Sequence, residues 1–390
     1  MIRQRSDIKG AQRIVVKIGS SLLADSDTMD SGAGGVQMAR VQRFADEIAA
    51  LHAAGREVIV VSSGSVALGR VHLGWVGRKL SVHEKQAAAA IGQPALMHAY
   101  KQAFSGHGIG VAQMLLTRDD LRNRRRYLNA SNTGETLLSA GVVPIVNEND
   151  TVVVQEIKFG DNDNLGALVS LLLDADLLVI MTDVDALYDA NPAVCSTAQR
   201  IGLVEVITPA VMDMAGATSS HFGTGGMASK LKAARVATRG GVATAVLSGE
   251  KPDMLAALLD GADIGTLFAC GGDRQTRRQH WIAEVLHPAG RIVIDEGAAR
   301  ALLTHGASLL PVGVRQIEGA FDKGECVEIV AGDQVIARGL CNYNAEEMRL
   351  LAGVASEDIE RVLGYMDFSS VVHRDNLVLQ GGVLLNEKEE

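Results

Sequence analysis

Short apolar runs alternate with longer stretches of helical spacing over the first 270 residues of the chain. The runs rich in Val, Ile and Leu predict strands, and the stretches with apolar residues every three or four positions predict helices. Because several strands are apolar on both faces, helices should cover both faces of a mainly parallel sheet, which gives an α/β fold of the three-layer αβα sandwich type. The predicted strands are 13–18, 57–61, 110–115, 142–146, 177–182 and 243–247, and the predicted helices include 36–54, 84–104, 162–173 and 227–239.

The apolar pattern lapses after residue 270 into a polar, Arg-rich stretch, GGDRQTRRQ. We place a linker over 271–287 there, between a catalytic domain over 1–270 and a smaller domain over 288–380. Short strands at 291–294, 313–318, 325–330 and 335–341 lie between Gly and Asp turn signals, with little helix expected, and predict a small β-barrel-like module. A further alternating run, 152–159, predicts a hairpin strand.

Composition excludes several classes of protein. With 390 residues, 47% of them hydrophobic and 21% charged, the chain can bury a continuous core, and its net charge of −9 opposes nucleic acid and anionic membranes as partners. Four dispersed cysteines without a CxxC pair favour a reduced, cytoplasmic setting, and the absence of an apolar leader or span predicts no membrane association. The ten histidines form no HExxH pattern, so we expect no protein-bound metal.

Two predicted strands end in turns suited to anions. In VVKIGSSLL (15–23), Lys17 ends a strand and Gly19 lets backbone amides approach a phosphate, because open α/β sheets bind ligands beyond the carboxyl ends of their strands. The alternative is a lysine that only reaches solvent from a strand end. In VSSGSVALG (61–69), Ser63 and its neighbours can bind a carboxylate or phosphate, or act as ordinary helix caps.

Asn and Asp residues gather in two further turns, PIVNENDTV (144–152) and FGDNDNLGALVS (159–170). Their amides can hold the polar ends of an amino acid and an aspartate can hold lysines in position, whereas the alternative is plain Asx-turn chemistry. Thr182 and Asp183 follow the most apolar strand, where an adenine or ribose could bind or where the chain simply turns.

The segment GTGGMASKLKAA (223–234) opens an Ala-rich helix with three glycines and two hydroxyls. Backbone amides at such a helix start can wrap a polyphosphate while Lys230 adds positive charge, although the same residues can serve only to start the helix. The spacing differs from that of a P-loop. The run RNRRR (122–126) is interpreted as a solvated helix face or a subunit contact, because no aromatic residues are interleaved with it apart from Tyr127.

Taken together and in this order, VVKIGSSLL, VSSG, AQMLLTR, IVNENDTV, GDNDNLGAL, TDVDALYDANP and GTGGMASK resemble the amino-acid kinase superfamily, and within it the glutamate 5-kinase family. The C-terminal PAG, IDEGA, SLLPVGV and GYMDFSSVVHRD resemble a PUA domain. The resemblance implies catalytic roles for Lys17, Lys230 and Asp163, with the aspartate organising the lysines. It implies glutamate-binding roles for Ser63, Asp150 and Asn162, and ATP-binding roles for Lys17, Gly19, Thr182, Asp183, Thr224, Gly225, Gly226, Met227, Ala228, Ser229 and Lys230.

The implied reaction is ATP-dependent phosphorylation of the side-chain carboxylate of L-glutamate, with Mg²⁺ carried on the nucleotide. The resemblance further implies feedback inhibition by proline, a homodimer or homotetramer, and association with glutamate-5-semialdehyde dehydrogenase. Ser62 and Ser65 stand where relatives commonly show Thr and Ala, and the loop 25–35 has no assigned contact. The alternatives are a sibling kinase for aspartate, acetylglutamate or uridylate, and an RNA-binding protein acting through the C-terminal module, whose segment 288–366 has seven basic against twelve acidic residues.

Overall fold

The computed structural model describes residues 1–24, 35–152, 162–192, 194–215, 226–271 and 286–380. The chain divides into two compact units, Met1–Arg118 with Asn129–Asp273, and Asp119–Leu128 with Arg274–Glu390. Nearly all of the expected hairpin strand at 152–159 and of the linker at 271–287 lies outside the described residues, and the domain limits 1–270 and 288–380 stay a prediction. In the described part of the chain, no helix combines the length and apolarity needed to cross a membrane.

An eight-stranded sheet forms the centre of the first unit, in the order β3-β4-β2-β1-β5-β9-β10-β8. Every neighbouring pair is parallel except β9 with β10, which confirms the predicted mainly parallel sheet. The six predicted strands agree with the observed ones to within two residues. The strands are β1 (Arg13–Ile18), β2 (Glu57–Ser62), β3 (Val111–Leu116), β4 (Val143–Glu148), β5 (Leu177–Thr182), β8 (Leu203–Val204), β9 (Ala243–Ser248) and β10 (Thr266–Phe268).

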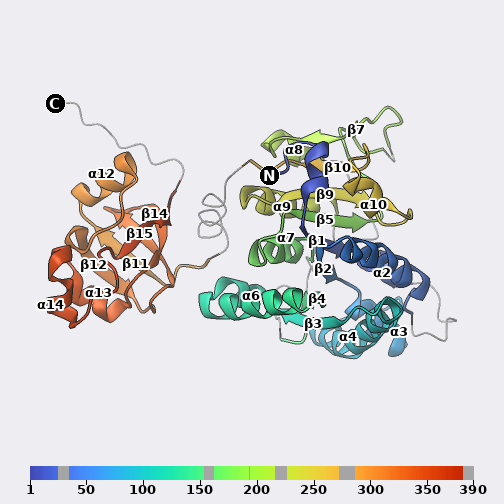
Figure 1. Cartoon of the computed structure of the whole chain (residues 1–390), viewed down its shortest axis with the longest axis horizontal. Coiled ribbons are helices and arrows are strands. Elements are labelled where there is room, and N and C mark those ends of the chain that lie inside the picture. The colour runs from blue at the N-terminus through green and yellow to red at the C-terminus, as the bar shows by residue number, and fades with distance from the viewer. Residues whose placement is uncertain (25–34, 153–161, 193, 216–225, 272–285, 381–390) are drawn as a thin grey trace. The chain divides into compact units, whose positions relative to one another are not determined.

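Helices pack on both faces of this sheet (Figure 1). Alternate residues of β1 share one core with Phe44 and Tyr100 on one face. Lys17 belongs to the opposite face, where a Cβ on Gly166 would lie 3.4 Å from the Lys17 Cβ. The strand period of two therefore turns Lys17 toward α7. The first face carries α2 (Met38–Ala53) and α4 (Val82–Ser105), and the second carries α7 (Asn162–Leu172) and α9 (Met227–Arg239).

The remaining elements of the first unit are short or lie outside the two main layers. They are a 3₁₀ helix (Arg5–Gly10), α1 (Ser20–Leu23), α3 (Ser65–His72), the part of α6 (Arg124–Ser139) from Asn129 onward, β6 (Leu187–Tyr188), β7 (Arg200–Ile201), α8 (Pro209–Met214) and α10 (Met254–Leu259). Most of α5 (Arg118–Arg122) and the start of α6 fall in the second unit.

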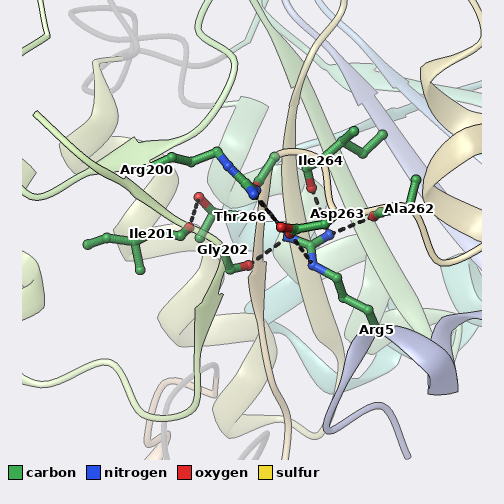
Figure 2. A network of polar contacts seen from close by, with 9 residues as sticks. Arg5, Arg200, Ile201, Gly202, Ala262, Asp263, Ile264 and Thr266 are labelled. Carbon is green, nitrogen blue, oxygen red and sulfur yellow. Dashed lines mark hydrogen bonds and ion pairs between the residues drawn. The ribbon is translucent and has the colours of Figure 1, made fainter.

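Arg5 ties the N-terminal 3₁₀ helix to the far edge of the sheet (Figure 2). Its guanidinium lies 3.0 Å from the carboxylate of Asp263, which also pairs with Arg200 at 2.7 Å. Thr266 joins the same network by donating to a β7 carbonyl oxygen at 2.7 Å. Strands as short as β8 and β10 form few ladder hydrogen bonds, so these side-chain contacts stabilise the edge. Arg5 also donates to the carbonyl oxygens of Gly202, Ala262, Ile264 and Gly265.

The second unit is built on a five-stranded mixed sheet in the order β12-β11-β13-β14-β15. Only β11 and β13 pair in parallel. The expectation of little helix here is wrong, because α12, α13 and α14 all belong to this unit. The signals that bound α12 are an N-cap at Asp295 and a left-handed glycine, Gly306, at its C-terminal end. The elements are β11 (Gly290–Ile294), α12 (Glu296–His305), β12 (Val314–Gly319), β13 (Cys326–Ala331), β14 (Gln334–Cys341), α13 (Ala345–Leu351), α14 (Ile359–Leu363) and β15 (Val372–Leu379).

Candidate active site

The turns that follow β1, β2, β5 and β9 are hydrogen-bonded to one another at the carboxyl edge of the parallel sheet. Gly19 N–H donates to the carbonyl oxygen of Met181 at 3.1 Å, and Gly249 N–H donates to that of Thr182 at 2.7 Å. Ser63 N–H donates to the last carbonyl of β1 at 3.3 Å. Segments far apart in the sequence thus form one continuous rim, where a doubly covered parallel sheet places its ligands.

A charged centre lies on this rim. Lys17 Nζ is 2.6 Å from Asp163 Oδ1, and Lys230 Nζ is 3.4 Å from Asp163 Oδ2. Ser229 Oγ donates to the same Oδ2 at 2.7 Å. The exposed fractions of Lys17, Asp163 and Lys230 are only 7%, 2% and 3%. The structure therefore brings together the three residues that the sequence singled out as catalytic, from β1 and from the first turns of α7 and α9.

The electrostatics of this centre favour an ionised Asp163. Burial acts to raise the pKa of Asp163, but the adjacent Lys17 and Lys230 outweigh it and lower that pKa to about 2. Burial lowers the pKa of Lys230, and Asp163 opposes this effect. Two ammonium groups around one carboxylate leave a single uncompensated positive charge in a buried place, which is suited to an anionic ligand.

The helix start beside Lys230 supplies backbone donors. Gly226 caps α9, and the hydroxyl of Ser229 lies within hydrogen-bond distance of both Asp163 Oδ2 (2.7 Å) and the Gly226 carbonyl oxygen (2.8 Å). Met227 is buried and Ala228 is exposed. Thr182 Oγ1 donates to Asp183 Oδ1 at 2.8 Å, and the Asp183 charge acts on Lys230. Thr224 and Gly225 lie outside the described residues.

Neutral amides and hydroxyls occupy the neighbouring part of the rim. Asn162 Nδ2 donates to Ser63 Oγ at 2.7 Å and to Asn147 Oδ1 at 3.1 Å. Asn147 Nδ2 donates to Gln93 Oε1 at 2.8 Å and lies 3.4 Å from Ser65 Oγ. Within the described structure, the buried Asn162 Oδ1 has no hydrogen-bond partner. A buried acceptor without a donor is costly, so a ligand N–H group would be favoured there.

Asp150 lies at the end of this network and at a cavity. Its Oδ2 accepts a hydrogen bond from Ser65 Oγ at 3.0 Å. Burial raises the pKa of Asp150, and the Ser65 hydrogen bond partly opposes the shift. A cavity of about 260 Å³ opens beside it, lined by parts of α3, α4 and β3 and by the turn after β4. The volume is ample for a small polar molecule.

The structure thus separates the candidate residues into two neighbouring groups. One contains Lys17, Asp163, Lys230 and Ser229, and the other links Ser63, Asn162 and Asp150 through Asn147 and Ser65. Sequence reasoning included Asn147 among the turn amides that can hold the polar ends of an amino acid, without giving it a partner within the protein, and it missed Gln93 altogether. Gln93 lies in a predicted helix more than 50 residues before Asn147, so only the tertiary contact reveals it.

A mainly parallel sheet with paired lysines at its carboxyl edge defines the class of the amino acid kinases, and residues 12–248 match the model of the amino acid kinase family. Residues 290–363 match the PUA domain. Glutamate 5-kinases from Trichlorobacter lovleyi and Geobacter sulfurreducens are each 50% identical to the chain, over 96% and 94% of it and 99% and 97% of their own lengths. The chain belongs to the glutamate 5-kinase family. A solved carbamate kinase from Giardia lamblia covers 67% of this chain and 100% of its own, with 16% identity and a TM-score of 0.49.

Proposed function

We propose that the chain transfers the γ-phosphoryl group of ATP to the side-chain carboxylate of L-glutamate and so forms L-glutamyl 5-phosphate, the first step of proline biosynthesis. The observation that carries this proposal is the buried Lys17–Asp163–Lys230 centre next to the hydrogen-bonded amides of Asn162 and Asn147. Family membership supports the choice of substrate.

The acceptor needs no general base in this reaction, because a glutamate side chain with a pKa of about 4.3 is already ionised at pH 7. The difficulty is the repulsion between an anionic nucleophile and an anionic phosphate. Lys17 and Lys230 offset that repulsion and align the migrating group, each contributing roughly 3 to 4 kcal/mol as a preorganised donor. Asp163 keeps the two ammonium groups apart and oriented, so its contribution is positional.

Each substrate has its own part of the rim in this proposal. Thr182, Asp183 and the segment from Gly226 to Lys230 hold ATP, and Gly19, which has no side chain beside Lys17, leaves room for the phosphates. Mg²⁺ would be carried on the nucleotide phosphates and would supply part of the charge neutralisation there. Ser63, Asp150 and Asn162 hold glutamate. The Asn162 Oδ1, which has no partner among the described residues, and the Asp150 carboxylate provide acceptors for the ammonium group of the amino acid.

Trapping the acyl phosphate with hydroxylamine tests the proposal. ATP-dependent hydroxamate should form with L-glutamate at a much higher kcat/KM than with L-aspartate or N-acetylglutamate, while UMP should stimulate no release of ADP. Efficient turnover of one of the other acceptors, with little or none of glutamate, would replace this function by that of a sibling kinase.

Regulation and assembly form a further part of the proposal, supported by the family resemblance. Proline would inhibit the enzyme, the chain would form a homodimer or homotetramer, and glutamate-5-semialdehyde dehydrogenase would receive the labile acyl phosphate directly in the cytoplasm. Hydroxamate assays with and without proline, light scattering, and pull-down with the dehydrogenase at micromolar concentrations test these three points separately.

A further inference from the structure

A chain of four side-chain amides runs from the rim of the site into the wall of the cavity. Asn162 donates to Asn147 at 3.1 Å, Asn147 donates to Gln93 at 2.8 Å, and Gln93 donates to Gln113 at 3.1 Å. Asn162, Asn147 and Gln93 are each at most 9% exposed. Every contact joins an N–H₂ group to a carbonyl oxygen, so the orientation of each amide depends on that of the next.

One backbone group determines the direction of this chain. The N–H of Glu148 donates to Asn147 Oδ1 at 2.9 Å. A backbone N–H can only donate, so Asn147 keeps its oxygen toward Glu148 and Asn162 and turns its Nδ2 toward Gln93. Gln93 must then present Oε1 to Asn147, which places its own Nε2 against Gln113.

The orientation of Asn147 determines the orientation of the Asn162 amide. Its Nδ2 is used by Asn147 and Ser63, so its Oδ1 is the atom left over, and this oxygen is buried without a partner in the described part of the chain. If Asn162 were flipped, its two donors would be left for a ligand instead. The direction of the amide chain therefore decides whether the site offers an acceptor or a donor.

Gln93 itself is held at a fixed place. A Cβ on the preceding Gly92 would lie 1.8 Å from the carbonyl oxygen of Ser65, so the backbones of α4 and α3 touch at this point. Such close backbone contact prevents α4 from shifting relative to α3. Gln93 can thus act as a rigid support for Asn147 rather than as an adaptable side chain.

We propose that Gln93 is a positioning residue for substrate selection: through Asn147 it keeps the Asn162 Oδ1 available as an acceptor for the ammonium group of the amino-acid substrate. This inference rests on the proposed function, in which Asn162 contacts glutamate. Gln93 acts through Asn147, and its role is to make the site prefer an amino acid over the same dicarboxylate without an ammonium group.

Three variants of the full-length protein test the proposal. Gln93→Met keeps the length of the side chain but removes the acceptor for Asn147. Gln93→Glu keeps an acceptor, and the exposed Gln113 can turn to donate to it. Gln102→Met, at an exposed position of the same helix, is the matched control. The readout is the ratio of the inhibition constant of glutarate, which lacks the ammonium group, to the KM of L-glutamate.

We expect Gln93→Met to lower this ratio about tenfold or more, because Asn147 loses the acceptor of its Nδ2, shifts about its remaining contact with Glu148, and no longer holds Asn162 with Oδ1 toward the ligand. Gln93→Glu and Gln102→Met should stay within about twofold of the unsubstituted protein, and the KM of ATP should be unchanged in all of them. If Gln93→Met does not fold, as judged by circular dichroism, Gln93→Asn is used, since its shorter side chain cannot reach Asn147.

An equal loss of affinity for glutamate and glutarate in the Met or Asn variant would overturn the positioning role and leave Gln93 a packing residue. A drop of the ratio in Gln93→Glu equal to that in Gln93→Met would overturn it as well, because the acceptor would then be irrelevant. Absence of glutamate hydroxamate from the unsubstituted protein would instead remove the proposed function, and this result is distinct from the other two.

Discussion

The two halves of the candidate site solve opposite electrostatic problems. The phosphate half gathers full charges, with Lys17 and Lys230 around Asp163. The amino-acid half consists mainly of neutral dipoles, with Asn162, Asn147 and neighbouring hydroxyls linked by hydrogen bonds. Both halves are buried, and they meet at the start of α7, where Asn162 and Asp163 are adjacent in sequence.

This difference follows from what each half must bind. A migrating phosphoryl group carries high charge, so only full positive charges in a place of low dielectric constant can offset it. An amino acid carries charges of both signs on small groups, so orientation of dipoles matters more than net charge. The amino-acid half therefore depends on geometry, and the phosphate half depends on charge.

The largest expected effect comes from removing a charge. Lys17→Ala and Lys230→Ala should each lower kcat at least about 100-fold, because each lysine stabilises charge that is greatest in the transition state. The KM of glutamate should change little, as measured by steady-state hydroxamate kinetics. Lys232→Ala, exposed on the same helix as Lys230, is the control. Turnover like that of the unsubstituted protein in either variant would remove that lysine from the catalytic set.

The second effect separates charge from position within the phosphate half. Asp163→Asn should lower kcat about 50-fold, because the lysines lose the carboxylate that orients them. The KM of ATP should not rise, since the net charge of the centre increases by one. Asp174→Asn, exposed just beyond the end of α7, is the control. A strongly raised KM of ATP with an unchanged kcat would mean that Asp163 serves nucleotide binding rather than lysine orientation.

The lowered pKa of Asp163 predicts that the free energy of unfolding decreases at acid pH. The pKa of Asp163 is about 2 in the folded protein, below its ordinary value of 3.8, so its contribution is fully present above about pH 4 and is lost as the pH falls toward 2. Urea unfolding between pH 2 and pH 5 should show this loss, and Asp163→Asn should lack it. An identical decrease of the free energy of unfolding in the variant would assign this pH dependence to other carboxylates.

The charged half could be predicted from sequence, and the neutral half only in part. Lys17 ends a buried strand and Lys230 follows a glycine-opened turn, so local pattern and the topology of a parallel sheet place both at one edge. Gln93 stands in an Ala-rich helical stretch, where local spacing contains no information about a partner near residue 147. The short β8 and β10 were missed for a related reason, because Arg5, far away in the sequence, stabilises the residues that precede both strands.

The third effect tests the only carboxylate of the amino-acid half that was singled out from sequence. Asp150→Ala should raise the KM of glutamate about 30-fold and that of ATP far less, as expected for loss of a hydrogen bond to a charged group. Asp213→Ala, exposed on α8, is the control. A larger rise in the KM of ATP would mean that the two substrate subsites are exchanged.

Asp150 also predicts a pH dependence of glutamate binding. Burial raises the pKa of Asp150 above its ordinary 3.8, so the carboxylate becomes protonated at a higher pH than an exposed aspartate. The KM of glutamate should therefore rise as the pH falls through this raised value, and Asp150→Asn should abolish that rise. A rise that persists in Asp150→Asn would assign the titration to another group.

The smallest expected effect comes from a single hydroxyl. In the unsubstituted protein, the hydrogen bond from Ser65 Oγ to Asp150 Oδ2 at 3.0 Å lowers the pKa of Asp150. Ser65→Ala removes this hydrogen bond and therefore raises that pKa. The KM of glutamate should rise about fivefold, and its increase at low pH should begin at a higher pH than in the unsubstituted protein. Ser105→Ala, at the exposed end of α4, should change neither. A fivefold rise in the KM of glutamate at every pH, with no change in the pH at which it increases, would show that Ser65 contacts the substrate instead of lowering the pKa of Asp150. The amino-acid half would then depend less on its internal hydrogen bonds than its geometry indicates.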